Sequence, residues 1–489
     1  MIPQLTEQNI LNKTLDSVIT SNERVLVASF QKRKNKFPES TIDFYKNHIS
    51  QSNWSALFSE YPVATNMVAN EETKKRRLIE TIISRFSHDY DELRTYGIIQ
   101  DVNLYIKNIE IGAGDLHRGM STAIVELSND QKIIFKPTGA TVSEALFSFL
   151  DWINSYASLG HYKFKFVDKQ SYQWIEYVDY LGCNTEEELQ TYYTRAGYLI
   201  AIVYLLDGFD YHCENLIAHG STPVLIDHET ITQPSMGNKY QKYFKTVTKS
   251  VEESVLKGHL LPKRNKESLM PVGMCGLGYH KEKEQRSIQK VGINRFSDSW
   301  KMVTKFVTTK LYGNNIPFLD GEKKYPHEYI DYIIAGFEEL YTIILNEQSL
   351  LRSENSPLRS FDHARIRFIW RPTNIYGKIK ARLKMPENLQ DFHHYENKLR
   401  AYLSKAFENV SAGQSGLNSI LESEISQMLK GDIPYFDMVA SSKDLQTDSG
   451  IINDFFELNC RENTIRKLDR FSLKDLERQK EIIKESILD

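Results

Sequence analysis

The chain has only four cysteines in 489 residues, and none of them forms a C-x-x-C pair. Their scattered positions give no sign of a disulfide framework or a structural zinc site. The sequence also lacks an apolar run near the ~18 residues that span a membrane, and its N-terminus lacks the basic-then-apolar order of a signal peptide. We therefore expect a soluble cytoplasmic protein that has no membrane partner.

An excess of charge of either sign is absent as well. The formal net charge of −3 argues against a general nucleic-acid-binding protein. No internal repeat or low-complexity segment is visible. With 41% hydrophobic residues the chain can bury a sizeable core, and its length allows about three domains or one enlarged catalytic domain.

What the sequence does contain is a dense polar stretch between residues 206 and 229. Asp210 and Asn215 have the D-x-x-x-x-N spacing of a kinase catalytic loop, which also contains His212, and Asp227 follows a short apolar run. In such a loop the first carboxylate faces a substrate hydroxyl. The amide and the second carboxylate are oxygen ligands for the magnesium on the nucleotide phosphates. Because polar groups at the end of an apolar strand are costly unless used or paired, the set favours phosphoryl transfer over a surface turn.

Short apolar segments before this stretch predict strands that end at a lysine. Val102–Ile106, Ala123–Leu127 and Lys132–Phe135 are typical of strands, and the polar turn between the last two predicts a hairpin. Lys136 ends the second strand of that hairpin. Its position is that of a kinase lysine that binds nucleotide phosphates as a point charge. The alternative is an edge lysine that favours solubility.

The segments between Lys136 and the catalytic loop follow the element order of a kinase. We expect a helix over Val142–Ser155, strands over Tyr162–Val167 and Tyr172–Tyr177, and then a long amphipathic helix that leads to the loop. Glu144 is a candidate partner for Lys136 by analogy with the Lys–Glu pair of kinases. An acid favoured there by the helix dipole is the alternative. The order predicts, by analogy, a two-lobed kinase with the nucleotide between its lobes.

A glycine-containing loop lies ahead of the lysine hairpin. Gly112 and Gly114 fit the kinase pattern G-x-G-x-x-G, but the next glycine is displaced to Gly119. Glycines there can let backbone N–H groups approach phosphates. Asp115 and His117 are the unusual members of this loop, because a plain kinase loop has no need of an imidazole. A turn with a surface histidine is the alternative.

A basic strand is predicted far downstream, where residues 364–371 read ARIRFIWR. Strand alternation places Arg365, Arg367 and Arg371 on one face and apolar side chains on the other. Pro372 ends the strand and Thr373 follows it. Such a basic face can bind phosphate through bidentate hydrogen bonds, and an ordinary half-buried strand is the alternative.

Together these segments resemble the dehydratase portion of class II lanthipeptide synthetases, the LanM enzymes. The resemblance rests on GDLHRGMSTAIVELSNDQKIIFKP, DYHCENLIAHGSTPVLIDHET, RFIWRPTNIYG and GDIPYF, which occur in the family's order from about Gly112 to the C-terminus. It implies an α+β fold with a two-lobed catalytic core, similar to lipid kinases and related to protein kinases. Helical regions are added to that core at both ends.

The resemblance implies two reactions in one site. ATP, with Mg²⁺, phosphorylates a Ser or Thr in the core of a ribosomally made precursor peptide that carries a leader. The phosphate is then eliminated with the Cα proton, which leaves dehydroalanine or dehydrobutyrine. The matching catalytic positions are Asp210, His212, Asp115, His117, Arg367 and Thr373. The matching nucleotide-binding positions are Lys136, Asn215, Asp227 and Glu229, of which Asn215 and Asp227 hold magnesium.

The residues that a plain kinase does not need suit the elimination of phosphate. A β-elimination needs a base near the Cα–H and positive charge on the departing phosphate, and these roles fit His117, oriented by Asp115, and Arg367. Thr373 can hydrogen-bond either the phosphate or the developing enolate. The sequence leaves the identity of the base open.

One departure from the family concerns ring formation. A full LanM enzyme continues into a zinc-dependent cyclase domain, whereas this sequence ends at Asp489 and has no Cys-His dipeptide or other zinc-ligand cluster. We therefore expect no cyclase activity in this chain. Either a separate LanC-like cyclase acts afterwards, or the product keeps its dehydrated residues, or the sequence is part of a longer protein. In place of the family's DLE, the chain has Asp227-His228-Glu229, which keeps both acids.

The expected organisation has four regions. They are a helical N-terminal region (1–95), a kinase-like N-lobe with the catalytic loop (96–229), an enlarged activation-segment-like region (230–359) and the C-terminal part of the dehydratase (360–489). The third region is expected to hold helices near Ser297–Leu311 and Glu328–Leu345 and to contact the peptide. Helical spacing from Leu417 to Leu429 and over Ser472–Leu488 predicts packed helices near the C-terminus.

Two other functions stay open. One is a kinase that stops at phosphopeptide or phosphorylates a small molecule, which a dispersed elimination set would favour. The other is a catalytically inactive protein that binds the leader peptide. The intact set of Lys136, Asp210, Asn215 and Asp227 argues against the inactive protein.

Overall fold

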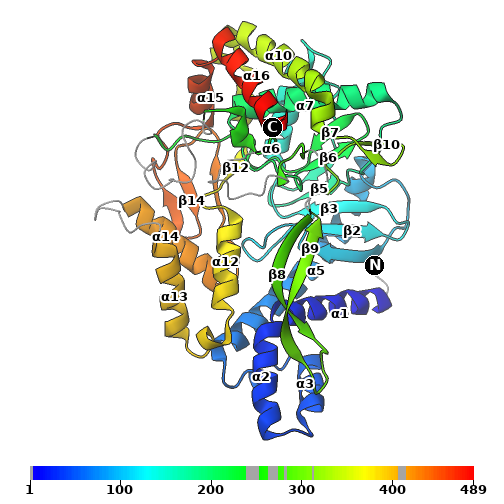
Figure 1. The fold of residues 1–489 in the computed structure, drawn as a ribbon, viewed down its shortest axis with the longest axis vertical. Helices are drawn as coiled ribbons and strands as arrows, with labels where there is room; N and C mark the ends of the chain where they lie inside the picture. The colour runs from blue at the N-terminus through cyan, green and yellow to red at the C-terminus, as the bar shows by residue number, and fades with distance from the viewer. Residues whose placement is uncertain are drawn as a thin grey trace.

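The computed structural model describes residues 4–237, 253–262, 274–279, 284–310, 313–405 and 415–488. It combines helices with small antiparallel sheets, as the mixed α and β patterns predict. Figure 1 shows the N-terminal helices at one end and a five-stranded sheet in the middle. At the other end lie α7 (Glu186–Leu206), α10 (Ile330–Asn346), α15 (Cys460–Leu468) and α16 (Leu473–Leu488). None of the helices in the described ranges is long and apolar enough to cross a membrane.

The first ninety-odd residues are helical, as predicted. The helices are α1 (Gln4–Ser21), α2 (Glu23–Lys36), α3 (Thr41–Ser50), α4 (Trp54–Leu57) and α5 (Pro62–Thr95). Pro62 stands at the first turn of α5, where its missing N–H costs no hydrogen bond. The apolar face of α5 that contains Leu78, Ile82 and Phe86 is buried against the five-stranded sheet.

The five-stranded sheet has the order β1-β2-β3-β5-β4, and each pair of adjacent strands is antiparallel. Its strands are β1 (Ile106–Ile111), β2 (Ala123–Leu127), β3 (Lys132–Lys136), β4 (Phe166–Asp168) and β5 (Gln173–Glu176). The predicted hairpin is confirmed. The strand predicted over Val102–Ile106 is wrong, because β1 begins only at Ile106, where the alternation of buried residues starts.

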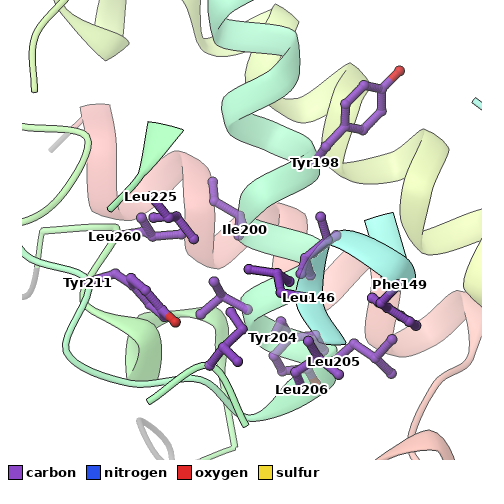
Figure 2. Close-up of a cluster of buried hydrophobic side chains, with 14 of the residues drawn as sticks. Leu146, Phe149, Tyr198, Ile200, Tyr204, Leu205, Leu206, Tyr211, Leu225 and Leu260 are labelled. Atoms are coloured by element: carbon purple, nitrogen blue, oxygen red, sulfur yellow. The ribbon is translucent and has the colours of Figure 1, made fainter. Parts of the chain in front are cut away.

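The largest core lies around α6 (Thr141–Asn154) and α7 (Glu186–Leu206). Figure 2 shows Leu146 and Phe149 of α6 beside Tyr204, Leu205 and Leu206 of α7. The helix α10 (Ile330–Asn346) packs directly on α7. A β-carbon on Gly197 would overlap the Ile333 carbonyl oxygen, and one on Gly336 would overlap that of Thr194, so the two glycines allow this close contact.

The chain after α7 forms the hairpin of β6 (Leu216–His219) and β7 (Thr222–Leu225). A second sheet, with the order β12-β13-β14-β15, forms near the C-terminus. Its strands are β12 (Arg365–Phe368), β13 (Phe436–Val439), β14 (Leu445–Thr447) and β15 (Gly450–Ile452). The predicted basic strand is therefore confirmed only over Arg365–Phe368, because Arg371 lies beyond β12 and forms an ion pair with Glu424. The last helices, α15 (Cys460–Leu468) and α16 (Leu473–Leu488), pack against the α7 side.

The region after the catalytic stretch corrects one prediction. The helix expected near Ser297–Leu311 is wrong, because Lys301–Lys310 is strand β9, which pairs over its whole length with β8 (Glu284–Ile293). The helix expected near Glu328–Leu345 is confirmed as α10. Smaller elements here are η1 (Val255–Gly258), β10 (Phe318–Leu319), β11 (Glu322–Lys323), η3 (Pro326–Tyr329), α11 (Gln348–Arg352) and η4 (Pro357–Phe361). The Lys-rich residues 263–269 and 280–283 lie outside the described residues.

The helices α12 (Thr373–Leu383), α13 (Phe392–Ser404) and α14 (Ser415–Leu429), with η5 (Pro386–Asn388), share a separate core with α2, α3 and α4. Trp300, at the turn of the β8–β9 hairpin, is fully buried in that core. Segments from the start, middle and end of the chain are thus locked together at the lower end of Figure 1.

Candidate active site

The first contact of the candidate site joins two predicted residues. Lys136 ends β3, Asp227 follows β7, and the Lys136 Nζ atom lies 2.6 Å from Asp227 Oδ1. Burial opposes ionisation of Asp227, but the neighbouring ammonium holds the pKa of this carboxyl at about 2. The suggested Lys136–Glu144 pair is wrong, because Glu144 is exposed on α6 and the Lys136 ammonium donates to Asp227 instead. Glu144 therefore fits the helix-dipole alternative.

The predicted catalytic loop begins where α7 ends in a left-handed residue, Asp207, with φ of 64°. Asp210 is also left-handed, with φ of 71°. The Asn215 side-chain amide donates to the Asp210 carbonyl oxygen at 2.8 Å, and the Ile226 N–H donates to the Asn215 carbonyl oxygen at 3.1 Å. These bonds hold the loop against the chain segment that carries Asp227.

The Asp210 carboxylate lies in an unusual electrostatic setting. Burial is the main cause that raises its pKa to about 6, and the carboxylates of Asp227 and Glu229 add to the effect. His212 is half-buried in the same loop, with its Nε2 atom 3.5 Å from the amide nitrogen of Asn215. A carboxyl with a pKa near the working pH is suited to accept a proton from a hydroxyl.

Glu229 joins the catalytic stretch to the C-terminal sheet. The Arg367 guanidinium lies 2.9 Å from Glu229 Oε1, and the Arg367 main-chain N–H donates to the Glu229 carbonyl oxygen at 2.7 Å. Arg367 is buried, and although burial opposes its charge, Glu229 raises its pKa. A residue predicted for phosphorylation and one predicted for elimination are therefore in direct contact.

His117 has one ring nitrogen fixed and the other open. Its Nδ1 atom lies 2.8 Å from the Ile433 carbonyl oxygen. Because that oxygen can only accept, Nδ1 carries the proton and donates a hydrogen bond to it. The Nε2 atom is buried and has no hydrogen-bond partner among the described residues. Burial, with the nearby charges of Arg367 and Arg118, lowers the pKa of His117 to about 3. The imidazole is therefore neutral at physiological pH, with its Nε2 lone pair available.

Tyr435 connects these groups, and the sequence reasoning missed it. Its ring centroid lies 5.1 Å from that of His117 and 5.3 Å from the guanidinium carbon of Arg367, and its hydroxyl lies 3.5 Å from Glu229 Oε2. The guanidinium carbon of Arg118 is 5.0 Å from the same ring. Its segment, GDIPYF, carried the family resemblance, but nothing in the sequence assigns a role to the tyrosine.

The structure does not bring Asp115 and Thr373 into this group of contacts. Asp115 is exposed and makes no hydrogen bond to His117 within the described ranges, so the idea that it orients the imidazole is wrong. The Ile433 carbonyl oxygen, and not Asp115, forms the hydrogen bond that orients the His117 ring. Thr373 is the first residue of α12 and is half-buried. The roles of Asp115 and Thr373 in elimination stay predictions.

The loop that carries His117 is held by the segment around Tyr435. The Ile433 N–H donates to the Leu116 carbonyl oxygen at 2.8 Å, and the Gly119 N–H donates to Asp432 Oδ1 at 3.2 Å. Lys74 of α5 forms an ion pair with the same Asp432 oxygen at 2.7 Å. The loop is therefore anchored to the C-terminal part of the chain.

The residue that departs from the family pattern, His228, is structural. It is buried, its Nε2 atom lies 2.9 Å from the Leu225 carbonyl oxygen and its Nδ1 lies 3.0 Å from the Ser143 hydroxyl. Its ring stacks on Phe164 at 5.3 Å. Burial lowers the pKa of His228 to about 4, so it packs as a neutral ring between α6 and the catalytic stretch.

The oxygen atoms of Asn215 and Asp227 fit magnesium. Because the Asn215 amide nitrogen donates to a carbonyl, its Oδ1 atom is left for a cation, and Asp227 keeps Oδ2 free of the Lys136 contact. Magnesium in nucleotide sites takes one or two carboxylates and completes its shell with phosphates and water. Within the described residues, no cluster of three or more His, Cys, Asp or Glu side chains suits a metal held by protein alone.

A cavity of about 520 Å³ adjoins Lys136 and Glu229. The β3–α6 connection, the start of α6, the β4–β5 turn and strands β12 and β13 form its walls. Its size lies within the range of small-molecule sites. A polar site of this kind, with strongly shifted carboxyl and imidazole pKa values beside a cavity, is typical of an enzyme active centre.

Two comparisons with known proteins found related sequences. The family described as "Domain of unknown function (DUF4135)" matches residues 61–439. The chain is 29% identical, over 483 residues, to the lacticin 481/lactococcin biosynthesis protein LcnDR2 of Lactococcus lactis subsp. lactis. That match covers 92% of this chain and 49% of the relative, so the chain spans about half the length of the curated relative it matches. The resemblance to the dehydratase portion of class II lanthipeptide synthetases is confirmed.

Proposed function

This chain belongs to the DUF4135 domain family, and we propose that it is an ATP-dependent peptide dehydratase of lanthipeptide-type biosynthesis. Its substrate is a ribosomally made precursor with a leader and a core that contains Ser and Thr. The chain works as a kinase and then as a phosphate lyase. It acts in the cytoplasm, and any thioether rings are closed by a cyclase activity such as a LanC-like protein.

The phosphorylation step rests on the catalytic loop. Asp210 accepts the proton of the Ser or Thr hydroxyl, helped by a pKa near 6. Lys136 orients the nucleotide phosphates, and Asn215 and Asp227 hold Mg²⁺, which neutralises the charge on the transferred group. His212 supports the loop beside Asn215.

The elimination step rests on the neutral imidazole. His117 Nε2 takes the Cα proton of the phosphorylated residue, and the electrons of that bond form the Cα=Cβ double bond. The Cβ–O bond breaks, and the phosphate leaves with its oxygen and its charge toward Arg367. The buried Nε2 atom, with Nδ1–H fixed by Ile433, presents its lone pair in a single tautomer.

The observation that carries the proposal is the contact between Glu229 and Arg367. It joins the group of residues suited to phosphate transfer to the group suited to phosphate release. A phosphorylated side chain therefore needs no long transfer between two separate centres.

Intact-mass spectrometry of a cognate precursor, incubated with the protein, ATP and magnesium, tests the proposal. A loss of about 18 Da per modified residue, the mass of one water, is expected. Gains of about 80 Da, one phosphoryl group each, would refute the lyase half and leave a kinase. No mass change would refute both halves and favour a protein that only binds the leader peptide.

One observation favours the kinase without elimination. Asp115 and Thr373 make no hydrogen bond to His117 or Arg367 in the described parts of the chain. The mass assay separates the two functions directly, because only elimination lowers the peptide mass.

A further inference from the structure

The cavity beside Lys136 is bounded by only some of the candidate site residues. Lys136, Glu229 and Tyr435 line it, whereas Asp210, Asn215 and Asp227 do not. The proposed magnesium ligands therefore lie outside its walls, whereas Lys136 and Glu229, which we assign to the nucleotide, belong to them. The other lining residues decide which further ligand the cavity can take.

An unsatisfied acceptor lies in the wall of the cavity. Gln173 is opposite Lys136 in the β3–β5 register, so both side chains project from the same face of the sheet. Its Nε2 atom donates to the Gly139 carbonyl oxygen at 3.1 Å, but its Oε1 atom has no hydrogen-bond partner in the described residues. The residue is only 2% exposed. An amide oxygen buried without a donor is costly, so the wall is suited to a ligand that brings an N–H group.

Two arginines in the lining of the cavity share one carboxylate. Arg118 Nη2 lies 3.2 Å from Asp437 Oδ1, and Arg365 Nη1 lies 2.8 Å from Asp437 Oδ2. The Arg118 Nε atom also faces Asp448 at 3.6 Å, and that carboxylate is shared with Lys430. Three cations therefore meet two carboxylates here. The side chains of Arg118 and Arg365 remain 43% and 56% exposed, with further N–H donors available.

The rest of the lining sets the size and polarity of the ligand. Val142, Phe164, Ile175 and Ile226 form an apolar wall, and Thr138, Ser143 and Ser171 add small hydroxyls. Lys136 and Glu229 mark the end nearest the candidate active site. A ligand that fits has an anionic group, a nearby N–H and little else that is charged.

We propose that this cavity binds the phosphorylated Ser or Thr residue of the peptide, with Arg118 and Arg365 on the phosphate and Gln173 Oε1 on a main-chain N–H. A phosphoresidue has both groups within one amino acid, and guanidinium forks match phosphate oxygens geometrically. The inference rests on the proposed function, because it concerns the intermediate held between the two reactions, before it reaches His117 and Arg367, which do not line the cavity. It gives a role to Arg365, which neither of the two proposed reactions uses.

The test measures binding of N-acetyl-O-phosphoserine-N-methylamide to the full chain by calorimetry, with inorganic phosphate and ATP as competitors. We expect about tenfold or greater weakening in Arg365→Ala and in Arg118→Ala. We expect Gln173→Leu to weaken the amide probe but not inorganic phosphate. Arg352→Ala, which removes a surface ion pair with Asp469, is the control and should bind as the unchanged chain does. Thermal unfolding of each variant confirms its folding.

Three results would overturn the proposal. They are equal affinity in Arg365→Ala and the unchanged chain, probe binding no tighter than that of inorganic phosphate, and displacement of the probe by ATP. The last would assign the cavity to the nucleotide. Because the probe is already phosphorylated, its binding needs no kinase activity. Failure of precursor dehydration with intact probe binding would therefore refute the proposed function alone.

Discussion

The Nδ1 atom of His117 lies 2.8 Å from the carbonyl oxygen of Ile433, a residue 316 positions further along the chain. A carbonyl can only accept, so this single contact fixes the imidazole tautomer and leaves Nε2 unprotonated. The state of the proposed base is thus set by a main-chain atom, which side-chain substitution at that position does not remove.

Replacing His117 should separate the two reactions. In His117→Ala we expect phosphorylated peptide to accumulate, with elimination slowed by roughly 10²–10⁴-fold, the usual contribution of a positioned base. Mass spectrometry over time reads both steps. His219→Ala is a matched control, because its Nδ1 atom also lies 2.8 Å from a carbonyl, that of Asp179, away from the site. Unchanged elimination in His117→Ala would remove the imidazole from the mechanism.

The pH dependence of phosphorylation should report Asp210. Burial raises the pKa of this carboxyl to about 6, so its ionised, proton-accepting form is lost as the pH falls through 6. We expect the phosphorylation rate to drop about tenfold per pH unit below that value. Elimination from a supplied phosphopeptide should lack this inflection, because the pKa of His117 is about 3. Asp210→Asn should abolish phosphorylation, and normal phosphate transfer in that variant would contradict its role.

Removing magnesium should stop phosphorylation. Asp227 and Asn215 are the proposed ligands, so EDTA should abolish phosphoryl transfer and added Mg²⁺ should restore it. Asp227→Asn weakens the ion's binding and also takes the carboxylate from Lys136. A magnesium titration of the phosphorylation rate should therefore shift to higher concentration or lose all signal in this variant. A phosphorylation rate that EDTA does not change would refute the magnesium site.

The buried Asp207 should matter for stability. Its carboxylate forms ion pairs with Lys257 and Lys467, each at 2.7 Å, which tie the end of α7 to η1 and α15. Burial opposes its charge, but the two lysines lower its pKa. We expect Asp207→Ala to reduce the free energy of unfolding by about 3–5 kcal/mol. Urea unfolding measures the change, and Glu481→Ala, which removes an exposed pair, should cost at most about 1 kcal/mol.

The lowered pKa of Asp207 also predicts how the free energy of unfolding changes in acid. A carboxyl whose pKa is lowered by folding stabilises the protein above its unfolded-state pKa, and that contribution is lost as the pH falls through the folded-state value. Stability of the unchanged chain should therefore decline in acid more than that of Asp207→Ala. Equal acid sensitivity of the two chains would contradict this account.

The contact between α7 and α10 should not tolerate a side chain. Gly197→Ala places a β-carbon on the Ile333 carbonyl and should cost about 1–3 kcal/mol in unfolding free energy. Gly377→Ala is the matched helical control, because no atom lies within 4 Å of a β-carbon there. That change should stabilise the chain by about 0.5–1 kcal/mol. Similar effects of the two substitutions would show that the helices are not in close contact.

The sequence predicted the parts of the site that depend on short separations. The strand ending at Lys136 and the spacing of Asp210, Asn215 and Asp227 were sufficient to expect one cluster, and the Lys136–Asp227 contact agrees. The predicted Lys136–Glu144 pair was wrong because the first turn of a helix favours an acidic residue whether or not a lysine lies nearby. Turn chemistry and spacing are local, so they can be read from one stretch of chain.

The parts that the sequence did not predict depend on distant partners. His117 takes its orientation from Ile433 and contacts Tyr435, and no local pattern encodes either pairing. The helix predicted over Ser297–Leu311 is strand β9 instead. Met302, Val303 and Phe306 also fit helical spacing, and only the pairing with Glu284–Ile293 decides between the two structures. The four regional boundaries and the kinase-like lobes stay predictions.

The long separation between His117 and Ile433 also has a consequence for biosynthesis of the chain itself. A nascent chain that has emerged as far as Glu229 already contains Lys136, Asp210, Asn215 and Asp227. It does not yet contain Ile433, and contacts of such long sequence separation close late because of their entropic cost. The eliminating half of the candidate site is therefore the part that is completed last on the ribosome.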